Sequence, residues 1–290
     1  MEWRDRQGNL VPGEKGQDKI LNFLYATAVG RGIVYVLIRP WVSRLAGAIM
    51  DCRLSCIAIK SFRKKCGIDM SQFEDRKYKS FNDFFGRQVR EGARPIDADP
   101  THLIAPCDSK VTAYSISDDL RVTIKGTEYT MDTLFRDSAI AETFAGGSFL
   151  LFRLTKDDYH RYCYIDSGIK GENVHIPGVF HTVNPAALSR RQVYKENTRE
   201  YTLLESQQFG RIVMMEIGAT MVGRIRNYHG AQEVQRGQEK GRFEFGGSSI
   251  VVCLQKGAVD VDADILANTA SDIETVVRMG ERIGIRPIEE

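Results

Sequence analysis

The character of the sequence changes at Pro95, and this change limits the fold more than any other feature of the chain. Before Pro95, apolar residues recur at helical spacing from Asp18 to about Lys65, interrupted at Pro40. After Pro95, short strand-forming runs follow one another and are separated by turn signals. The runs cover residues 111–116, 121–124, 148–154, 212–216, 221–225 and 250–254. The sequence therefore predicts an α+β protein, in which N-terminal amphipathic helices precede a β-rich barrel or sandwich.

This division predicts three segments. Residues 1–18 are polar, rich in glycine and without periodicity, so we expect a loose N-terminal arm there. Residues 19–95 form the helical segment, and residues 96–290 form one β-rich domain. With 42% hydrophobic and 27% charged residues, the chain has enough apolar material for a core and no signature of disorder. The formal net charge of +2 argues against a global basic field directed at nucleic acid.

The cysteines favour a reducing compartment. The six of them form no CxxC pair and no framework typical of a short secreted chain, so we expect free thiols in the cytosol. Cys163 has no second ligand at metal spacing, and no zinc site is predicted. The N-terminal sequence MEWRDR is too charged for a signal peptide, and no apolar run of about 18 residues is present to span a bilayer.

Cationic residues are spread through the predicted N-terminal helices. Apolar faces interleaved with cations suit the surface of an anionic bilayer. A helical cap on the core domain with a solvated basic face would give the same pattern, and both interpretations stay open on the pattern alone. The cations are Arg31, Arg39, Arg44, Arg53, Lys60, Arg63, Lys64 and Lys65.

The segment GRFEFGGSSIVV, residues 241–252, contains Gly-Gly-Ser-Ser between two strand-like runs. Glycines at a break in a strand pattern indicate a bulge, a tight bend or a close backbone approach. An ordinary β-turn is one interpretation. The other is chemical: without a Cβ, Gly247 leaves its carbonyl open to the hydroxyl of Ser248, as an N→O acyl shift requires.

Three further motifs contain candidate acid–base groups. Asp108 in APCDSKV stands in a turn before a strand, where a capping role is the alternative. His160 in DDYHRYC lies close to acids, tyrosines and a thiol, and such a histidine is either a general acid–base group or structural. His181 in GVFHTVNP is a second candidate imidazole, in an extended run.

Taken in order, these motifs resemble the phosphatidylserine decarboxylase family. The resemblance extends from Phe81 to Val252, which is most of the chain, and the combination of motifs is specific. The FGGSS sequence and the GVFHTVNP segment look more like the bacterial type II branch than the branch with an LGST cleavage site. The matching segments are FNDFFGRQVREGARPID, APCDSKV, DDYHRYC, GVFHTVNP, KENTREY, EIGATMVGRI and GQEKGRFEFGGSSIVV.

The resemblance implies a self-cleaving enzyme. Family members cut themselves at the Gly-Ser bond, here Gly247-Ser248, so the β chain would comprise residues 1–247 and the α chain residues 248–290. Ser248 Oγ would attack the Gly247 carbonyl to form an ester. Elimination to dehydroalanine and hydrolysis would then leave a pyruvoyl group at the new N-terminus and release ammonia. That group would serve as the electron sink for decarboxylation of phosphatidylserine to phosphatidylethanolamine and CO2, and no external cofactor is expected.

The family activates its serine with an Asp-His-Ser relay, and this chain departs from the usual pattern. Asp108 matches the acid, although Ser109 replaces the usual glycine after it. Family members commonly contain YHRxH, with the second histidine in the relay and the first near the substrate. Here the first is His160, but Cys163 occupies the second position. Either His160 serves both steps, or His160 serves decarboxylation and His181 activates Ser248; we favour the second hypothesis.

Two other functions stay open on the sequence. The substrate is either phosphatidylserine or a related amino-acid phospholipid, because head-group contacts cannot be recognised in the sequence. A non-catalytic lipid-binding relative is the third possibility, supported only by Ser109 and Cys163. A lipid substrate also favours peripheral attachment of the helices to an anionic membrane surface, on the cytoplasmic face of the cell membrane. The resemblance further implies paired α and β chains of one precursor, and family members are often homodimers.

Overall fold

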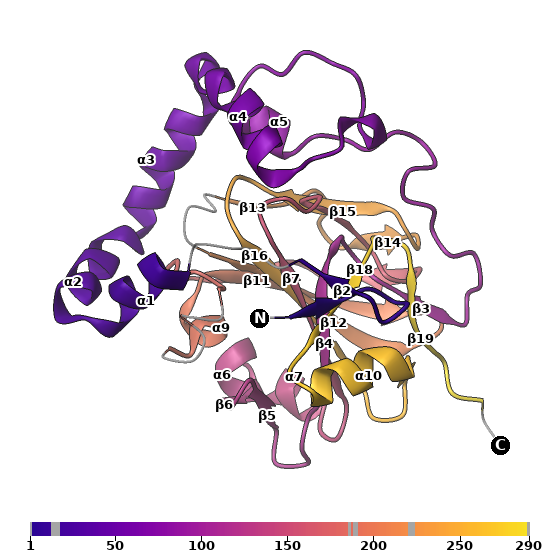
Figure 1. Cartoon of the computed structure of the whole chain (residues 1–290). Coiled ribbons are helices and arrows are strands. Elements are labelled where there is room, and N and C mark those ends of the chain that lie inside the picture. The colour runs from indigo at the N-terminus through magenta and orange to yellow at the C-terminus, as the bar shows by residue number, and fades with distance from the viewer. Residues whose placement is uncertain (1, 13–17, 185–186, 188–190, 220–223, 289–290) are drawn as a thin grey trace.

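The computed structural model describes residues 2–12, 18–184, 187, 191–219 and 224–288. Its N-terminal helices lie along one side of a β-rich part that contains most of the chain (Figure 1). They are α1 (Asp18–Ala26), α2 (Ala28–Leu37), α3 (Pro40–Asp51), η1 (Arg53–Cys56), α4 (Ile57–Cys66), η2 (Met70–Gln72) and α5 (Phe81–Phe85). The predicted helical region from Asp18 to about Lys65 is confirmed, and the FNDFF motif forms the short helix α5.

Local sequence explains where these helices begin and how they meet. The Thr27 side chain accepts a hydrogen bond from the backbone N–H of Gly30 and so caps α2. Pro40 begins α3, where its missing N–H costs no helical hydrogen bond. A Cβ at Gly30 would lie 2.4 Å from the backbone oxygen of Phe23, so only glycine allows α1 and α2 to approach this closely.

One large sheet forms the centre of the β-rich part. Its neighbouring strands are antiparallel except for one parallel pair, β1 with β18. The order along the sheet is β14 (Gln232–Val234), β9 (Gly168–Lys170), β11 (Arg199–Ser206), β12 (Gly210–Gly218), β16 (Ser248–Leu254), β7 (Ser148–Leu154), β4 (Ser109–Ser115), β18 (Glu274–Val277), β1 (Trp3–Arg4) and β2 (Leu10–Val11), and β10 (Val174–Ile176) also pairs with β11.

Smaller sheets and helices surround the large sheet. One three-stranded sheet consists of β13 (Ile225–Asn227), β15 (Glu239–Phe243) and β8 (Arg161–Cys163). Another consists of β17 (Asp260–Val261), β19 (Arg282–Ile285) and β3 (His102–Ile104), and β5 (Arg121–Ile124) pairs with β6 (Thr127–Thr130). The further helices are α6 (Met131–Phe135), α7 (Ser138–Glu142), α9 (Val193–Glu196) and α10 (Ala263–Ala270).

The central strands are covered on both faces. Along β7, Phe149 and Leu151 belong to one apolar cluster, while Leu150 and Phe152 belong to another. Because successive side chains of a strand point to opposite faces, the two clusters lie on opposite sides of the sheet. Burial on both faces explains why these strands have continuous apolar runs rather than alternating ones. The first cluster also includes Tyr25 and Val34, so the N-terminal helices pack on that face.

Most strand predictions are confirmed, with ends displaced by one or two residues. The predicted strand at 221–225 lies partly outside the described residues, and Ile225 begins β13. The α+β class is confirmed. The path of the large sheet has two free ends, at β14 and β2, and none of the sheets in the described ranges closes into a barrel.

The first residues of the chain differ from the loose arm that the sequence predicted for residues 1–18. Trp3 and Arg4 form β1, which pairs with β18 in the large sheet, and Trp3 is 5% exposed. Lys110 Nζ lies 4.7 Å from the centre of the Trp3 ring. A buried aromatic ring and a strand pairing hold this segment, and neither was evident from its polar composition. Residues 13–17 of the predicted arm lie outside the described residues.

Candidate active site

The Gly247-Ser248 bond lies at the entry of β16, a central strand of the large sheet. Ser248 pairs with Gly218 of β12 on one side and with Leu154 of β7 on the other. Its side chain is fully buried, and its Oγ has no hydrogen-bond partner among the described residues. Leaving a buried hydroxyl unpaired costs about 1–3 kcal/mol, so such a group calls for a functional or structural reason.

A four-residue connection, 244–247, joins β15 to β16. Gly246 has a φ of +136°, a backbone conformation that residues with a side chain rarely adopt. A Cβ at Gly247 would meet Val183 Cγ2 at 3.5 Å, which is ordinary contact. The bend therefore requires a glycine at position 246, whereas position 247 has room for a side chain. Packing thus does not require a glycine at position 247.

His160 lies at the other end of the same connection. Its backbone oxygen accepts a hydrogen bond of 2.9 Å from the N–H of Phe243, the last residue of β15. Its Nδ1 lies 3.0 Å from the backbone oxygen of Asp158. Since a carbonyl oxygen only accepts, Nδ1 carries the proton, and the lone pair is on Nε2. Nε2 is buried and has no hydrogen-bond partner in the described part of the chain.

The surroundings of His160 keep its ring neutral. Burial lowers the pKa of His160 to about 3, and the Arg87 guanidinium adds to the effect. The Phe85 ring lies 4.2 Å away, centre to centre. The imidazole is therefore uncharged near neutral pH, with the lone pair of Nε2 free. Ser248 Oγ and His160 Nε2, at the two ends of one short connection, make no hydrogen bond to each other.

The loop between β7 and β8 fixes the position of His160. The Lys110 ammonium lies 2.7 Å from Asp158 Oδ1 and 2.6 Å from Thr155 Oγ1. The backbone N–H of Thr155 donates to Asp158 Oδ2 at 2.6 Å. Burial raises the pKa of Asp158, and Lys110 opposes that shift. Because the backbone oxygen of the same Asp158 holds His160 Nδ1, this buried network orients the ring. Neither Lys110 nor Asp158 was evident as a site residue from the sequence.

Asp108 lies in the turn before β4, as predicted, and contacts an arginine. Arg94 Nε lies 2.8 and 3.0 Å from its two carboxylate oxygens, and Arg94 Nη2 lies 2.5 Å from Oδ2. The N–H of Met279 donates to Oδ1 at 2.9 Å. Both β4 and β16 flank β7, so Asp108 and Ser248 lie at the same end of the sheet, two strand spacings or about 10 Å apart. No hydrogen bond joins Asp108 to Ser248 or His160 in the described residues.

Cys163, which occupies the usual position of the second family histidine, is a buried neutral thiol. It lies in β8, where its N–H donates to the Pro106 oxygen, and burial raises its pKa to about 12. A thiol with such a pKa is no proton acceptor near neutral pH. Within the described ranges, no group of three His, Cys, Asp or Glu side chains is arranged to hold a metal ion.

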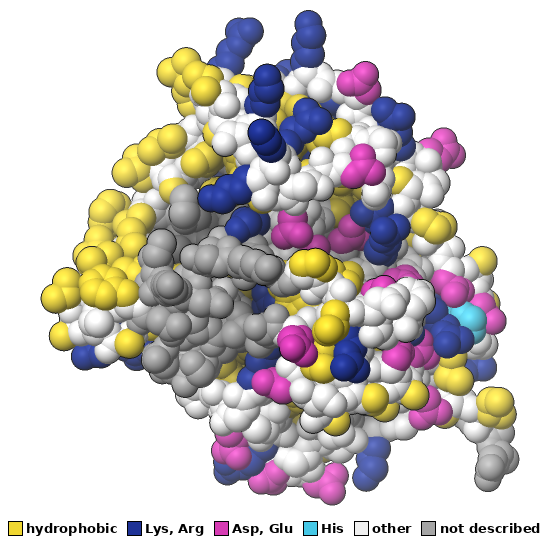
Figure 2. All heavy atoms as spheres, viewed as in Figure 1, with side chains coloured by type: hydrophobic (Ala, Val, Ile, Leu, Met, Phe, Trp, Pro, Cys, Tyr) yellow, Lys and Arg dark blue, Asp and Glu magenta, His cyan; other side chains and the backbone are white. Residues whose placement is uncertain are grey.

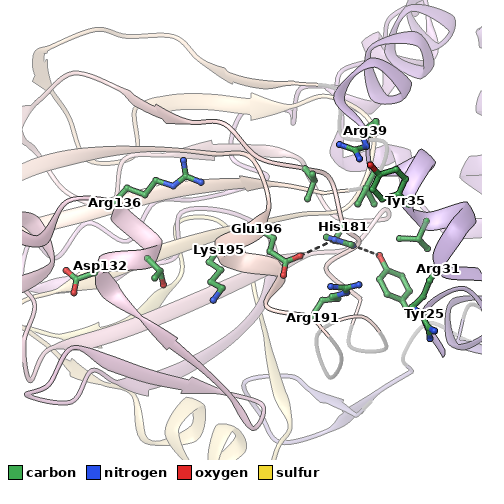
Figure 3. A pocket seen from close by; sticks show the side chains of 14 residues that line it. Tyr25, Arg31, Tyr35, Arg39, Asp132, Arg136, His181, Arg191, Lys195 and Glu196 are labelled. Atoms are coloured by element: carbon green, nitrogen blue, oxygen red, sulfur yellow. Dashed lines mark hydrogen bonds and ion pairs between the residues drawn. The ribbon is translucent and has the colours of Figure 1, made fainter. Parts of the chain in front are cut away.

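His181 has both of its ring nitrogens occupied. Nδ1 lies 3.2 Å from the Tyr25 hydroxyl of α1, and Nε2 lies 3.2 Å from Glu196 Oε2 of α9 (Figure 3). Burial lowers the pKa of His181, and Glu196 opposes the shift. His181 is therefore bonded to α1 and α9 and lines a surface cavity, and no hydrogen bond joins it to Ser248 in the described residues. Its segment still reaches the cleavage site, because Val183 borders Gly247.

Arg87 is a third residue near the site, after Lys110 and Asp158, that the sequence did not reveal. Its side chain is fully buried, and burial lowers its pKa to about 10. It donates long hydrogen bonds of 3.4 Å to the backbone oxygens of Asp157 and Asp158, and its guanidinium lies 4.3 Å from the Phe73 ring centre. The one signal in the sequence was its place directly after the aromatic run FNDFFG.

Comparison with known proteins gives a consistent result. The family model described as phosphatidylserine decarboxylase matches residues 81–285. Phosphatidylserine decarboxylase proenzyme 2 of Clostridium acetobutylicum is 42% identical over 265 residues, which are 91% of this chain and 91% of that protein. Phosphatidylserine decarboxylase proenzymes of Clostridium botulinum and Clostridium perfringens are 38% identical over 275 residues and 39% identical over 272 residues, covering 93% and 92% of both chains.

Proposed function

The chain belongs to the phosphatidylserine decarboxylase family, and we propose that it cuts itself at Gly247-Ser248 and then converts phosphatidylserine to phosphatidylethanolamine and CO2. One observation supports the site assignment above all others. Two residues lie at the ends of the connection that contains the Gly-Ser bond: Ser248, whose buried hydroxyl has no hydrogen-bond partner in the described residues, and His160, whose backbone bonds Phe243 and whose buried, neutral Nε2 also has none.

Self-cleavage follows from ordinary acyl chemistry. Ser248 Oγ loses its proton and attacks the Gly247 carbonyl carbon, and the peptide bond opens to an ester with a free Ser248 amine. Loss of the Ser248 Cα proton and of the Gly247 carboxylate leaves dehydroalanine. Addition of water and release of ammonia complete the conversion to a pyruvoyl group. The residues fit that group, because the precursor hydroxyl is buried and unpaired; once formed, the group supplies the electron sink for decarboxylation.

We assign proton transfer from Ser248 to His160. Its Nε2 lone pair is free because Nδ1–H donates to Asp158, and burial keeps the ring neutral. Asp108, paired with Arg94, is a candidate positioning residue at the same end of the sheet. The alternative that His181 activates Ser248 requires its ring to leave both Tyr25 and Glu196. The rates of cleavage in His160→Ala and His181→Ala distinguish the two assignments.

The two product chains are expected to stay together. The α chain would begin with β16, which is hydrogen-bonded along its full length between β12 and β7 of the β chain. All seven residues of β16 are buried. Cleavage at its first peptide bond removes no pairing partner of this strand. A homodimer of such cleaved units remains a prediction from the family resemblance.

Exposed apolar side chains on the N-terminal helices support membrane attachment. Among the described residues no single helix is long and apolar enough to cross a bilayer. Helices α2 and α3 reach that length and apolar composition only when taken together, and they are bent by 64° relative to each other. Figure 2 shows apolar side chains gathered over these helices. We define an apolar ridge of residues that are at least 40% exposed: Val29, Ile33, Tyr35, Val36, Leu37, Trp41, Leu45, Ile49, Leu54 and Ile57.

We propose that this ridge lies in the interface of the cytoplasmic membrane. An apolar surface of this kind on a helix pair, accompanied by cations, suits an anionic bilayer surface. The cations Arg44, Lys60 and Arg63 belong to the same helical segment. Such an attachment would bring the enzyme to its lipid substrate without a spanning helix.

The activity is tested with phosphatidylserine labelled at its carboxyl carbon and presented in vesicles. We expect release of labelled CO2, appearance of phosphatidylethanolamine by lipid mass spectrometry, and no turnover by the Ser248→Ala variant. If the protein decarboxylates a different amino-acid phospholipid and not phosphatidylserine, the substrate assignment is wrong and the assignment of the reaction stands. A cleaved protein that turns over neither lipid would contradict the proposed activity.

A further inference from the structure

A cavity of about 770 Å³ lies between the N-terminal helices and the β-rich part. Its wall on one side comes from α1 and α2, and on the other side from α6, α9 and the segment before α9 (Figure 3). Neither Ser248 nor His160 lines it. Binding sites for small organic ligands typically have volumes of about 300–1,000 Å³, and this cavity falls within that range.

The lining of this cavity is strongly cationic. It contains Arg31, Arg39, Arg136, Arg191 and Lys195, against the two carboxylates Asp132 and Glu196. Glu196 is already paired with His181. A cleft lined by charges of one sign concentrates its field and attracts ions of the opposite sign.

Within the residues that the structure describes, none of the five cations is neutralised by a carboxylate. Arg39 stacks over the Tyr35 ring at 4.0 Å, and Arg31 donates to the Ala26 backbone oxygen. In the described part of the chain, Arg136, Arg191 and Lys195 form no ion pair. Their side chains come from different segments and surround one space (Figure 3). Three unpaired cations around one cavity repel one another, and an anionic ligand would relieve that repulsion.

The cavity also has an apolar wall that a simple anion would not use. Val34, Tyr35 and Ile38 of α2 line it together with Val179. The same helix carries Ile33, Val36 and Leu37 of the apolar ridge on its exposed surface. A ligand with its phosphate among the cations and its hydrocarbon along α2 would therefore extend into the membrane interface in which we place the ridge.

We propose that this cavity binds the phosphodiester head group of a glycerophospholipid, with the acyl chains directed along α2 towards the ridge. The cations hold the phosphate, and the α2 wall contacts the glycerol and the first methylenes. The site is separate from the Gly247-Ser248 bond, so its occupancy depends neither on self-cleavage nor on turnover. Binding there would hold the protein at the bilayer beside its substrate.

The test uses full-length Ser248→Ala protein, in which no turnover disturbs a binding measurement. Short-chain phosphatidylglycerol, a phosphodiester lipid without the serine carboxylate, is titrated by calorimetry. We expect saturable binding at one site. Arg136→Glu and Lys195→Glu should each weaken it about ten- to a hundredfold, since each removes a charge-assisted hydrogen bond and adds a negative charge. Both side chains are at least partly exposed, and thermal unfolding verifies that the variants fold.

The control for net charge is Lys256→Glu, which makes the same charge change at an exposed position outside the cavity. It should leave the affinity unchanged; weakening equal to that of the cavity variants would contradict a specific site. Tyr35→Ser should weaken lipid binding and leave binding of inorganic phosphate unchanged. If inorganic phosphate binds as tightly as the lipid, the cavity is a phosphate site and the lipid proposal is wrong. If the wild-type protein releases CO2 from phosphatidylserine but does not bind short-chain phosphatidylglycerol, this inference is refuted and the proposed activity is not.

Discussion

Helices α2 and α3 leave large apolar side chains exposed, whereas the β-rich part buries charged ones. Val29 and Trp41 are 69% and 57% exposed. In contrast, Lys240 and Glu216 are fully buried and lie 2.8 Å apart, and Arg153 with Glu274 forms another buried ion pair. The β-rich part thus keeps charged groups away from water, and the helices keep an apolar surface that the described part of the chain does not cover.

We propose that this contrast separates two tasks in one chain. Self-cleavage requires a serine and a base that water does not reach, and the centre of a sheet covered on both faces provides this. Access to a lipid requires an apolar surface, and in our proposal the helical pair at the side of the sheet would provide it. The His181 ring, which contacts Tyr25 of α1 and Glu196 of α9, lies at the junction of the two regions.

The largest effect is expected from the reactive groups in the closed region. We predict that His160→Ala slows cleavage at Gly247-Ser248 by about 10²–10⁴-fold, the usual loss when a general base is removed. His181→Ala should leave cleavage within about threefold of wild type, because both of its ring nitrogens face other partners. The accumulation of the α chain with time, followed by mass spectrometry, measures both rates.

The two variants are controls for each other. Slow cleavage in His181→Ala with rapid cleavage in His160→Ala would reverse the assignment in favour of the hypothesis that the sequence first suggested. Slow cleavage in both, with unchanged thermal unfolding, would indicate that the histidines act in successive steps.

The second prediction concerns the buried pair of Asp108 and Arg94. Both side chains are at most 10% exposed, so Asp108→Asn leaves an unpaired buried guanidinium and should lower the free energy of unfolding by about 3 kcal/mol. Urea unfolding in the Ser248→Ala background measures this without interference from cleavage. The double variant Arg94→Met with Asp108→Asn should recover part of the loss. A double variant less stable than Asp108→Asn would argue that the charge pair is not the cause.

How much of this was visible in the sequence depends on the range of the interactions. Local patterns predicted the helices from Asp18 onwards and the central strands, because periodicity and turn residues act over a few positions. The Gly-Ser bond and His160 were also identified. Contacts between distant segments were not: Arg94 with Asp108, Tyr25 with His181, and the pairing of β1 with β18 all depend on tertiary packing. A histidine in an extended run gives no sign of which neighbours its ring will contact.

The third prediction uses the acid dependence of stability in the closed region. Burial would raise the pKa of Glu274, but Arg153 and Lys125 outweigh it and lower the pKa to about 2. A carboxyl group with a lowered pKa stabilises the fold above its ordinary pKa of 4.5, and this contribution is lost as the pH falls towards 2. At neutral pH the contribution is about 3 kcal/mol. Glu274→Gln should therefore be less stable than its parent near pH 7, and the difference should narrow in acid.

Urea unfolding at a series of pH values, again in the Ser248→Ala background, gives this difference directly. A gap between parent and Glu274→Gln that is constant from neutral pH to about pH 3 would mean that the ion pair does not set the pKa.

The smallest effect is expected on the open region. Leu45→Ser removes one ridge side chain that is 56% exposed, so we expect about 1 kcal/mol weaker partitioning onto anionic vesicles, roughly fivefold, and no change in thermal unfolding. Co-sedimentation with vesicles provides the measurement. Leu266→Ser on α10, outside the ridge and 47% exposed, is the matched control. Equal weakening in both variants would remove the ridge from the account.

The central claim is that this chain cuts itself at Gly247-Ser248, and the mass of the denatured protein tests it most directly. We predict two fragments, residues 1–247 and residues 248–290, the smaller with a pyruvoyl group in place of its N-terminal serine. Ser248→Ala should remain a single chain of 32.7 kDa. The matched control is Ser249→Ala, which should cleave: the Ser249 hydroxyl is also buried and has no hydrogen-bond partner among the described residues, but it does not directly follow the Gly247 carbonyl. A single uncut chain in the wild-type protein after incubation with phospholipid vesicles, or cleavage in Ser248→Ala, would contradict the account.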